Sequence, residues 1–135
     1  MIDRERVLNL LALLDDYLIE LEGSMGITLE EYKENIGVQR ISERLLQLIS
    51  EVELDISEEI YKGLELKFIT EEQSLLHALD NVLGKSVVGK IVARRNMRNQ
   101  LVHAYVSYNV EEVFSQASDL SDVKTFMNAT KKLIK

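Results

Sequence analysis

The sequence contains no cysteine and no proline, and only two of its 135 residues are histidine. The absence of cysteine excludes disulfide bonds and thiolate metal sites, and it suits a protein of the reducing cytoplasm. The absence of proline means that no residue interrupts a helix by ring clash or by a missing backbone N–H. A chain of this composition can therefore form long, unbroken helices.

Long apolar runs are also missing. The run "LLALLDD" stops at two aspartates, far short of the roughly 20 residues that a helix needs to cross a bilayer. The first residues, "MIDRERVLNLL", mix acids and bases and carry no cleavage site of a signal peptide. With 46% hydrophobic and 29% charged residues, the sequence predicts a soluble cytoplasmic protein with no membrane contact, built as one domain over residues 1–135.

Acidic residues are absent from one segment, residues 81–110, although the chain has a net charge of −7. This segment carries five cations, whereas the rest of the chain has eleven cations and 23 carboxylates. A negative surface repels the phosphates of a nucleic acid, so the charge pattern favours anion binding only at this segment. A solvated basic face on one helix would explain the same charges.

Apolar residues recur at spacings of three and four through most of the chain, and strand alternation is nearly absent. The spacing predicts a first helix along residues 7–21, ended by "EGSMGIT", and a long third helix along residues 38–60 that spans roughly 35–45 Å. A fourth helix should end near Gly84, and a fifth should continue from it into the basic segment. We therefore predict an all-α bundle.

Polar residues that cap helices mark the starts of the second and fourth helices and of two more helices after the fifth. They are Thr28 with Glu31, Thr70 with Gln73, Asn109 with Glu112, and Ser121.

The segment "RRNMRNQLVHAY", residues 94–105, concentrates the residues suited to chemistry. Asn99 and His103 are four apart and should share one helix face, whereas Arg98 and Tyr105 are seven apart and should share another. In a continuous helix, Arg98 and His103 would lie about 140° apart around the axis. Either the long guanidinium reaches toward the imidazole, or the two groups meet through a second copy of the chain.

These residue types suit cleavage of a phosphodiester. Histidine can take a proton from a ribose 2′-OH or give one to a leaving oxygen, and arginine can stabilise the negative charge that develops on the phosphate. Asparagine can orient the imidazole or donate to phosphate. Because no Asp, His and Cys cluster lies nearby in the sequence, we expect neither a metal nor a cofactor. From the residues alone, His103 could equally be a structural hydrogen-bonding residue.

The stretch "RNQLVHAY" resembles the signature of HEPN-domain proteins, in which an arginine and a polar residue precede a histidine. Here these are Arg98, Asn99 and His103, and Tyr105 completes an R-x4-H-x-Y pattern similar to that of the HepT branch. HepT proteins are toxins paired with a minimal nucleotidyltransferase antitoxin. The chain length, the helical pattern and the "NVEEVF" helix start extend the resemblance beyond the motif.

The resemblance implies a HEPN-type bundle and a metal-independent endoribonuclease toxin of a type VII toxin–antitoxin system. Its cleft would form where the motif helices of a homodimer meet, with Arg98, Asn99 and His103 as catalytic residues. The antitoxin would silence it by transferring AMP to Tyr105. Arg94 and Arg95 have no fixed family role, and we expect them, together with Lys90, to contact the RNA backbone. The alternative is a non-catalytic helical subunit that binds a nucleotide or presents substrate to the nucleotidyltransferase.

Overall fold

The regular elements of the structure are all helices. The computed structural model describes residues 1–66, 72–103 and 109–135, and these ranges contain eight helices and no strand. They are α1 (Arg4–Ser24), α2 (Leu29–Glu34), α3 (Ile36–Gly63), α4 (Glu72–His77), α5 (Asp80–Leu83), α6 (Lys85–Val102), α7 (Val110–Ser118) and α8 (Ser121–Leu133). The all-α prediction is confirmed. Within the same ranges, every helix is too short or too polar to span a membrane.

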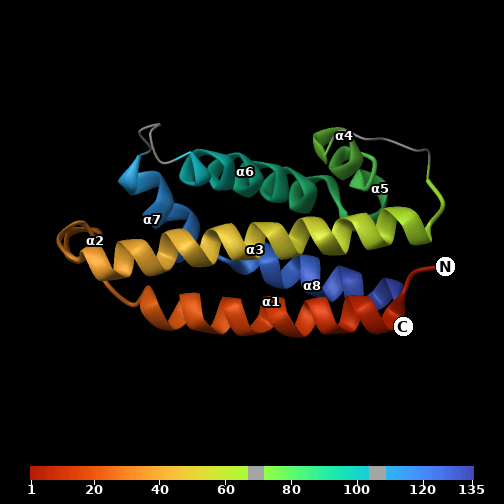
Figure 1. Cartoon of the computed structure of the whole chain (residues 1–135), viewed down its shortest axis with the longest axis horizontal. Coiled ribbons are helices and arrows are strands. Elements are labelled where there is room, and N and C mark those ends of the chain that lie inside the picture. Colours follow the sequence, from red (N-terminus) through yellow and green to blue (C-terminus); the bar gives the residue numbers. More distant parts are fainter. Residues whose placement is uncertain (67–71, 104–108) are drawn as a thin grey trace.

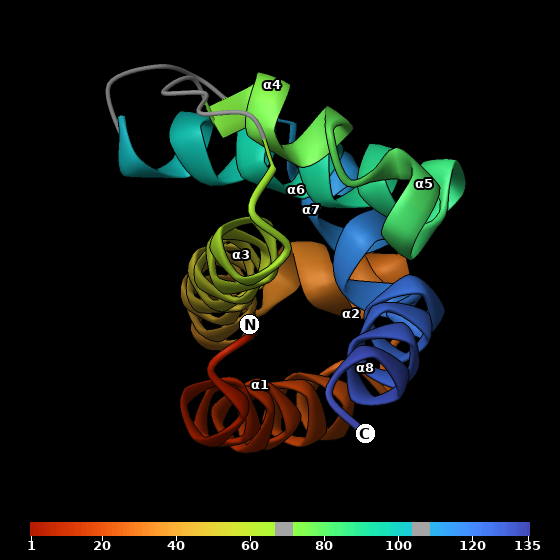
Figure 2. The same cartoon turned by 90° about the vertical axis from the view of Figure 1, so that its right-hand side faces the viewer.

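The helix α3 is the centre of the bundle. It lies between α1 and α6 in the side view (Figure 1), and the end-on view places α8 beside α1 and α3 (Figure 2). Its 28 residues span about 42 Å at 1.5 Å per residue, as the apolar spacing predicts. Ile49, Ile56 and Ile60 of α3 have no exposed surface, because neighbouring helices cover this helix on several sides.

Side-chain caps begin several helices. The Thr28 Oγ1 accepts a hydrogen bond from the Glu31 N–H at 3.2 Å, and Glu31 Oε1 accepts one from the Thr28 N–H at 3.1 Å, which confirms the predicted capping box. Asn109 Oδ1 accepts from the N–H groups of Glu111 and Glu112, which confirms the predicted start of α7. The other pattern, Thr70 with Gln73, involves a residue outside the described ranges.

The start of α8 differs from the prediction that Ser121 caps it. Leu120 occupies the N-cap position without a side-chain hydrogen bond, and Ser121 is the first helical residue. Asp119 accepts at Oδ1 from both the backbone N–H and the hydroxyl of Ser121. Asp119, the residue before the N-cap, thus accepts from the N–H of the first helical residue.

The predicted fourth helix is divided into α4 and α5, with Ala78 and Leu79 between them. Gly84 then joins α5 to α6 with a φ of +100°, a conformation that L side chains rarely adopt. This glycine turns the chain so that α6 packs along α3 (Figure 1). The position of the basic segment over the centre of the bundle depends on this turn.

Candidate active site

The helix α6 carries the basic segment and ends inside it. Its apolar side faces the core through Val88, Ile91 and Leu101. The last helical residue is Val102, and His103 follows as the C-cap with φ −89° and ψ 73°, while its backbone N–H still donates to the Asn99 carbonyl at 3.2 Å. The last regular turn of α6 therefore ends at His103.

The expected separation of about 140° between Arg98 and His103 around the helix axis stays a prediction, and the His103 N–H to Asn99 hydrogen bond keeps His103 one turn beyond Asn99. The non-helical ψ of His103 turns the chain that follows it away from the helix axis. The expectation that Tyr105 shares a face with Arg98 concerns a residue outside the described ranges. What remains is that His103 lies at the exposed end of α6, one turn beyond Asn99.

Arg98 and Asn99 contact each other directly. The Arg98 Nη1 donates a hydrogen bond to Asn99 Oδ1 at 3.0 Å. The Arg98 Nη2 donates to Glu51 Oε1 on α3 at 3.3 Å. The Nε of Arg98 is buried and has no acceptor in the part of the chain that the structure describes. The guanidinium is thus held at both terminal nitrogens while its side chain stays 36% exposed.

Arg98 and Asn99 line a groove of about 270 Å³ between α3 and α6. Its charged lining residues are Glu51, Asp55, Glu58, Arg95 and Arg98. The three carboxylates lie at spacings of four and three along α3, so they share one face of that helix. Burial raises the pKa of Asp55, and the charges of Glu51 and Glu59 raise it further although Arg6 opposes them. The α3 wall is therefore a region of negative potential opposite two arginines.

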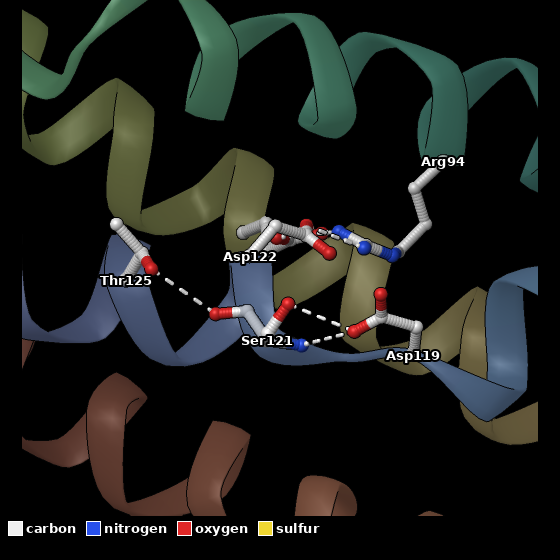
Figure 3. A network of polar contacts seen from close by, with 6 residues as sticks. Arg94, Asp119, Ser121, Asp122 and Thr125 are labelled. Atoms are coloured by element: carbon white, nitrogen blue, oxygen red, sulfur yellow. Dashed lines mark hydrogen bonds and ion pairs between the residues drawn. The ribbon is translucent and has the colours of Figure 1, made fainter.

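Arg94 is buried, with 4% of its surface exposed, although the sequence predicted an RNA contact. Its Nη1 lies 2.8 Å from both carboxylate oxygens of Glu53 on α3, and its Nη2 donates to Asp122 Oδ2 on α8 at 2.7 Å. Figure 3 shows Arg94 reaching from α6 toward Asp122. The expected phosphate contact is wrong for Arg94, because carboxylates of its own chain already bind the guanidinium in the interior.

The electrostatics of this ion network follow from its burial. Burial disfavours the charged guanidinium, but the nearby carboxylates of Glu53 and Asp122 outweigh that effect and raise the pKa of Arg94 above its ordinary value. Burial also raises the pKa of Glu53, and the Arg94 guanidinium opposes this rise. The guanidinium is therefore a permanent positive charge that ties α6 to α3 and α8.

The other predicted backbone contacts lie in two different places. Arg95 is partly exposed and lines the groove together with Arg98. Lys90 is exposed and lines a separate hollow of about 210 Å³, where Asp119 and Asp122 also lie. The structure thus brings Arg95, Arg98 and Asn99 together and leaves Lys90 apart from them. In the described ranges, no three His, Asp or Glu side chains form a group suited to hold a metal ion.

Comparisons with known proteins agree with the motif. A family model described as "Ribonuclease HepT-like" matches residues 14–130 of the chain. A similar protein is the tRNA nuclease HepT of Aphanizomenon flos-aquae (strain 2012/KM1/D3), which is 31% identical over 110 residues. That alignment covers 80% of this chain and 75% of that protein. Both matches include the groove and α6.

The ion network predicts a large loss of stability when Arg94 is removed. We expect Arg94→Met to lower the free energy of unfolding by about 3–5 kcal/mol, because Glu53 would stay buried without its partner. Arg95→Met, the neighbouring and partly exposed position, should change it by less than about 1 kcal/mol. Urea denaturation followed by circular dichroism measures both. Equal losses for the two variants would contradict a structural role specific to Arg94.

Proposed function

Because the chain belongs to the HepT-like ribonuclease family, we propose that it is a metal-independent endoribonuclease and the toxin of a type VII toxin–antitoxin system. The observation that carries the proposal is the hydrogen-bonded pair of Arg98 and Asn99 in a groove, one helical turn before His103 at the end of α6. An arginine for phosphate, a histidine for protons and an exposed location are the minimum that RNA cleavage requires. The relative's name supports tRNA as the substrate.

The proposed reaction begins at the ribose 2′-OH. His103 accepts the hydroxyl proton, and the 2′ oxygen attacks the adjacent phosphorus to form a 2′,3′-cyclic phosphate. The bond from phosphorus to the 5′ oxygen breaks, and that oxygen takes up a proton to leave as a 5′-hydroxyl. Arg98 stabilises the additional negative charge on the phosphate oxygens during the attack, and Asn99 holds the guanidinium through Nη1.

The proposed enzyme is a symmetric homodimer in which the ends of two α6 helices meet. Support comes from Val102, which is 47% exposed immediately before His103. An apolar side chain beside the reactive residues suits a two-fold contact, because such an interface presents the same patch from both copies. The dimer would double the cations around one cleft while the rest of the surface stays acidic, which limits RNA binding to the cleft.

The proposed antitoxin is a minimal nucleotidyltransferase that silences the enzyme at Tyr105. The phenolic oxygen of Tyr105 would attack the α-phosphorus of ATP, pyrophosphate would leave, and a base of the partner would take the phenolic proton. A free phenol has a pKa of about 10 and is a poor nucleophile, so the partner must supply that base and magnesium. Since Tyr105 is two residues beyond His103, the added phosphate would occupy the region that RNA needs.

The first test of the function is RNA cleavage in the presence of EDTA. We expect the wild type to leave 2′,3′-cyclic phosphate and 5′-hydroxyl ends on tRNA. His103→Ala should lower kcat by about 10²–10⁴-fold, and Arg98→Ala by about 10²–10³-fold. His77→Ala, which removes the other histidine from α4, should keep the activity. Full activity of His103→Ala would overturn the proposal, and an inactive wild type that still binds nucleotide would favour the non-catalytic subunit.

The dimer is tested at Val102. Sedimentation velocity at micromolar concentration should give a dimer for the wild type. Val102→Asp should shift it to monomer, because it places a charge in the apolar contact. Ile19→Asp is the matched control, since Ile19 is 62% exposed on α1. A monomeric wild type, or equal effects of the two variants, would contradict an interface at the end of α6.

The modification is tested by coexpression with a nucleotidyltransferase encoded beside this chain. Intact-mass measurement should show whole adenylyl units on the wild type and none on Tyr105→Phe, which lacks the acceptor oxygen. Tyr108→Phe is a matched control three residues further on and should be modified as the wild type is. If Tyr105→Phe carries as many adenylyl units as the wild type, the acceptor lies elsewhere.

A further inference from the structure

The groove that holds Arg98 carries more negative than positive charge. Its walls contribute the carboxylates of Glu51, Asp55 and Glu58 against the guanidiniums of Arg95 and Arg98. An RNA phosphate that approaches Arg98 is therefore repelled by the α3 wall before it reaches the guanidinium. A surface built only to attract RNA would not need these carboxylates.

One of these carboxylates, Glu51, already forms an ion pair with the Arg98 guanidinium. Glu51 Oε1 accepts from the Arg98 Nη2 at 3.3 Å, longer than the 2.7–2.9 Å typical of a strong charge-assisted hydrogen bond. The two side chains are 36% and 41% exposed, and ion pairs at such positions contribute little to stability. A phosphate offers the same negative charge and can accept two parallel hydrogen bonds from arginine. Exchange of the carboxylate for a phosphate therefore costs little.

The second contact of Arg98 is of a different kind. Asn99 Oδ1 accepts from Nη1 at the shorter distance of 3.0 Å, and the amide is neutral. It does not repel an incoming phosphate, so it can remain in place when the anion arrives. The hydrogen bond from Nη1 to Asn99 can therefore persist, while the Glu51 carboxylate at Nη2 can be exchanged for a phosphate.

We propose that Glu51 is a resident anion on Arg98 that the substrate phosphate displaces, and that it thereby sets the affinity of the protein for RNA. The inference rests on the proposed function, because it takes Arg98 as the residue that binds the reacting phosphate. RNA that offers only one phosphate gains little, since it replaces one anion by another. Displacement of Glu51 costs every RNA that binds Arg98 the same free energy, so Glu51 makes binding weaker and tight binding requires further contacts outside the groove.

Binding to RNA tests the inference without any need for cleavage. The probe is a short fluorescein-labelled single-stranded RNA, and fluorescence anisotropy measures its Kd in a His103→Ala background. Glu51→Gln should lower the Kd about fivefold, as expected for the loss of an exposed ion pair that competes with the ligand. Asp55→Asn removes the same charge from the same groove, whereas the two Arg98 hydrogen bonds described above go to Asn99 and Glu51. Its effect should be clearly smaller.

A double-mutant cycle separates displacement at Arg98 from general charge. In an Arg98→Ala background, Glu51→Gln should no longer lower the Kd. In steady-state cleavage with His103 intact, Glu51→Gln should lower KM about fivefold and leave kcat unchanged. An equal gain with and without Arg98, an equal gain from Asp55→Asn, or a loss of kcat would each overturn the inference. Absence of cleavage by the wild type would refute the proposed function alone, because the binding cycle still decides the role of Glu51.

Discussion

The ion network of Arg94, Glu53 and Asp122 decides how α6 sits on the bundle. Arg94 and Glu53 are buried and Asp122 is partly buried, and the attraction among them compensates for lost hydration only while they are in contact. A rotation of α6 about its axis would separate them and leave charges unpaired in the interior. The network therefore fixes which residues of the basic segment reach the groove.

The placement of the groove residues follows from that rotation. Arg98 lies one helical turn after Arg94, where it leaves the interior and meets Glu51 at the edge of α3. Arg95 lies next to Arg94 and lines the same groove. Lys90 precedes Arg94 by one turn and borders the hollow on the α8 side. Cations that look equivalent in the sequence thus have three different environments: the interior, the groove and a separate hollow.

The burial of Arg94 could have been predicted from the apolar spacing, although its partners could not. Arg94 follows the buried Ile91 by three residues and precedes the buried Met97 by three, so it lies on the inner stripe of α6. Glu53 likewise lies between the buried Ile49 and Ile56 of α3. A charge on each of two apolar stripes indicates a buried pair, but only the folded topology brings residues 41 positions apart into contact.

The helices themselves were predictable because spacing and caps are local, whereas two details are not. The end of α6 at Val102 has no glycine or proline beside it, so nothing in the neighbouring sequence marks it. The start of α8 offers two capping residues, Asp119 and Ser121, only two positions apart, and the choice between them depends on how the chain enters the helix. Ends of helices are set by tertiary packing as well as by local preference.

The early end of α6 divides the candidate site into a fixed part and an adjustable part. Arg98 and Asn99 belong to a helix whose torsions are held by its hydrogen bonds and by the buried ion network. His103 is the C-cap of α6, where its backbone N–H still donates to the Asn99 carbonyl but its ψ is no longer helical, and its side-chain torsions set the direction of the imidazole. A second copy or an inhibitor that changed the side-chain torsions of His103 would therefore align or misalign the proposed proton-transfer group without any repacking of the bundle.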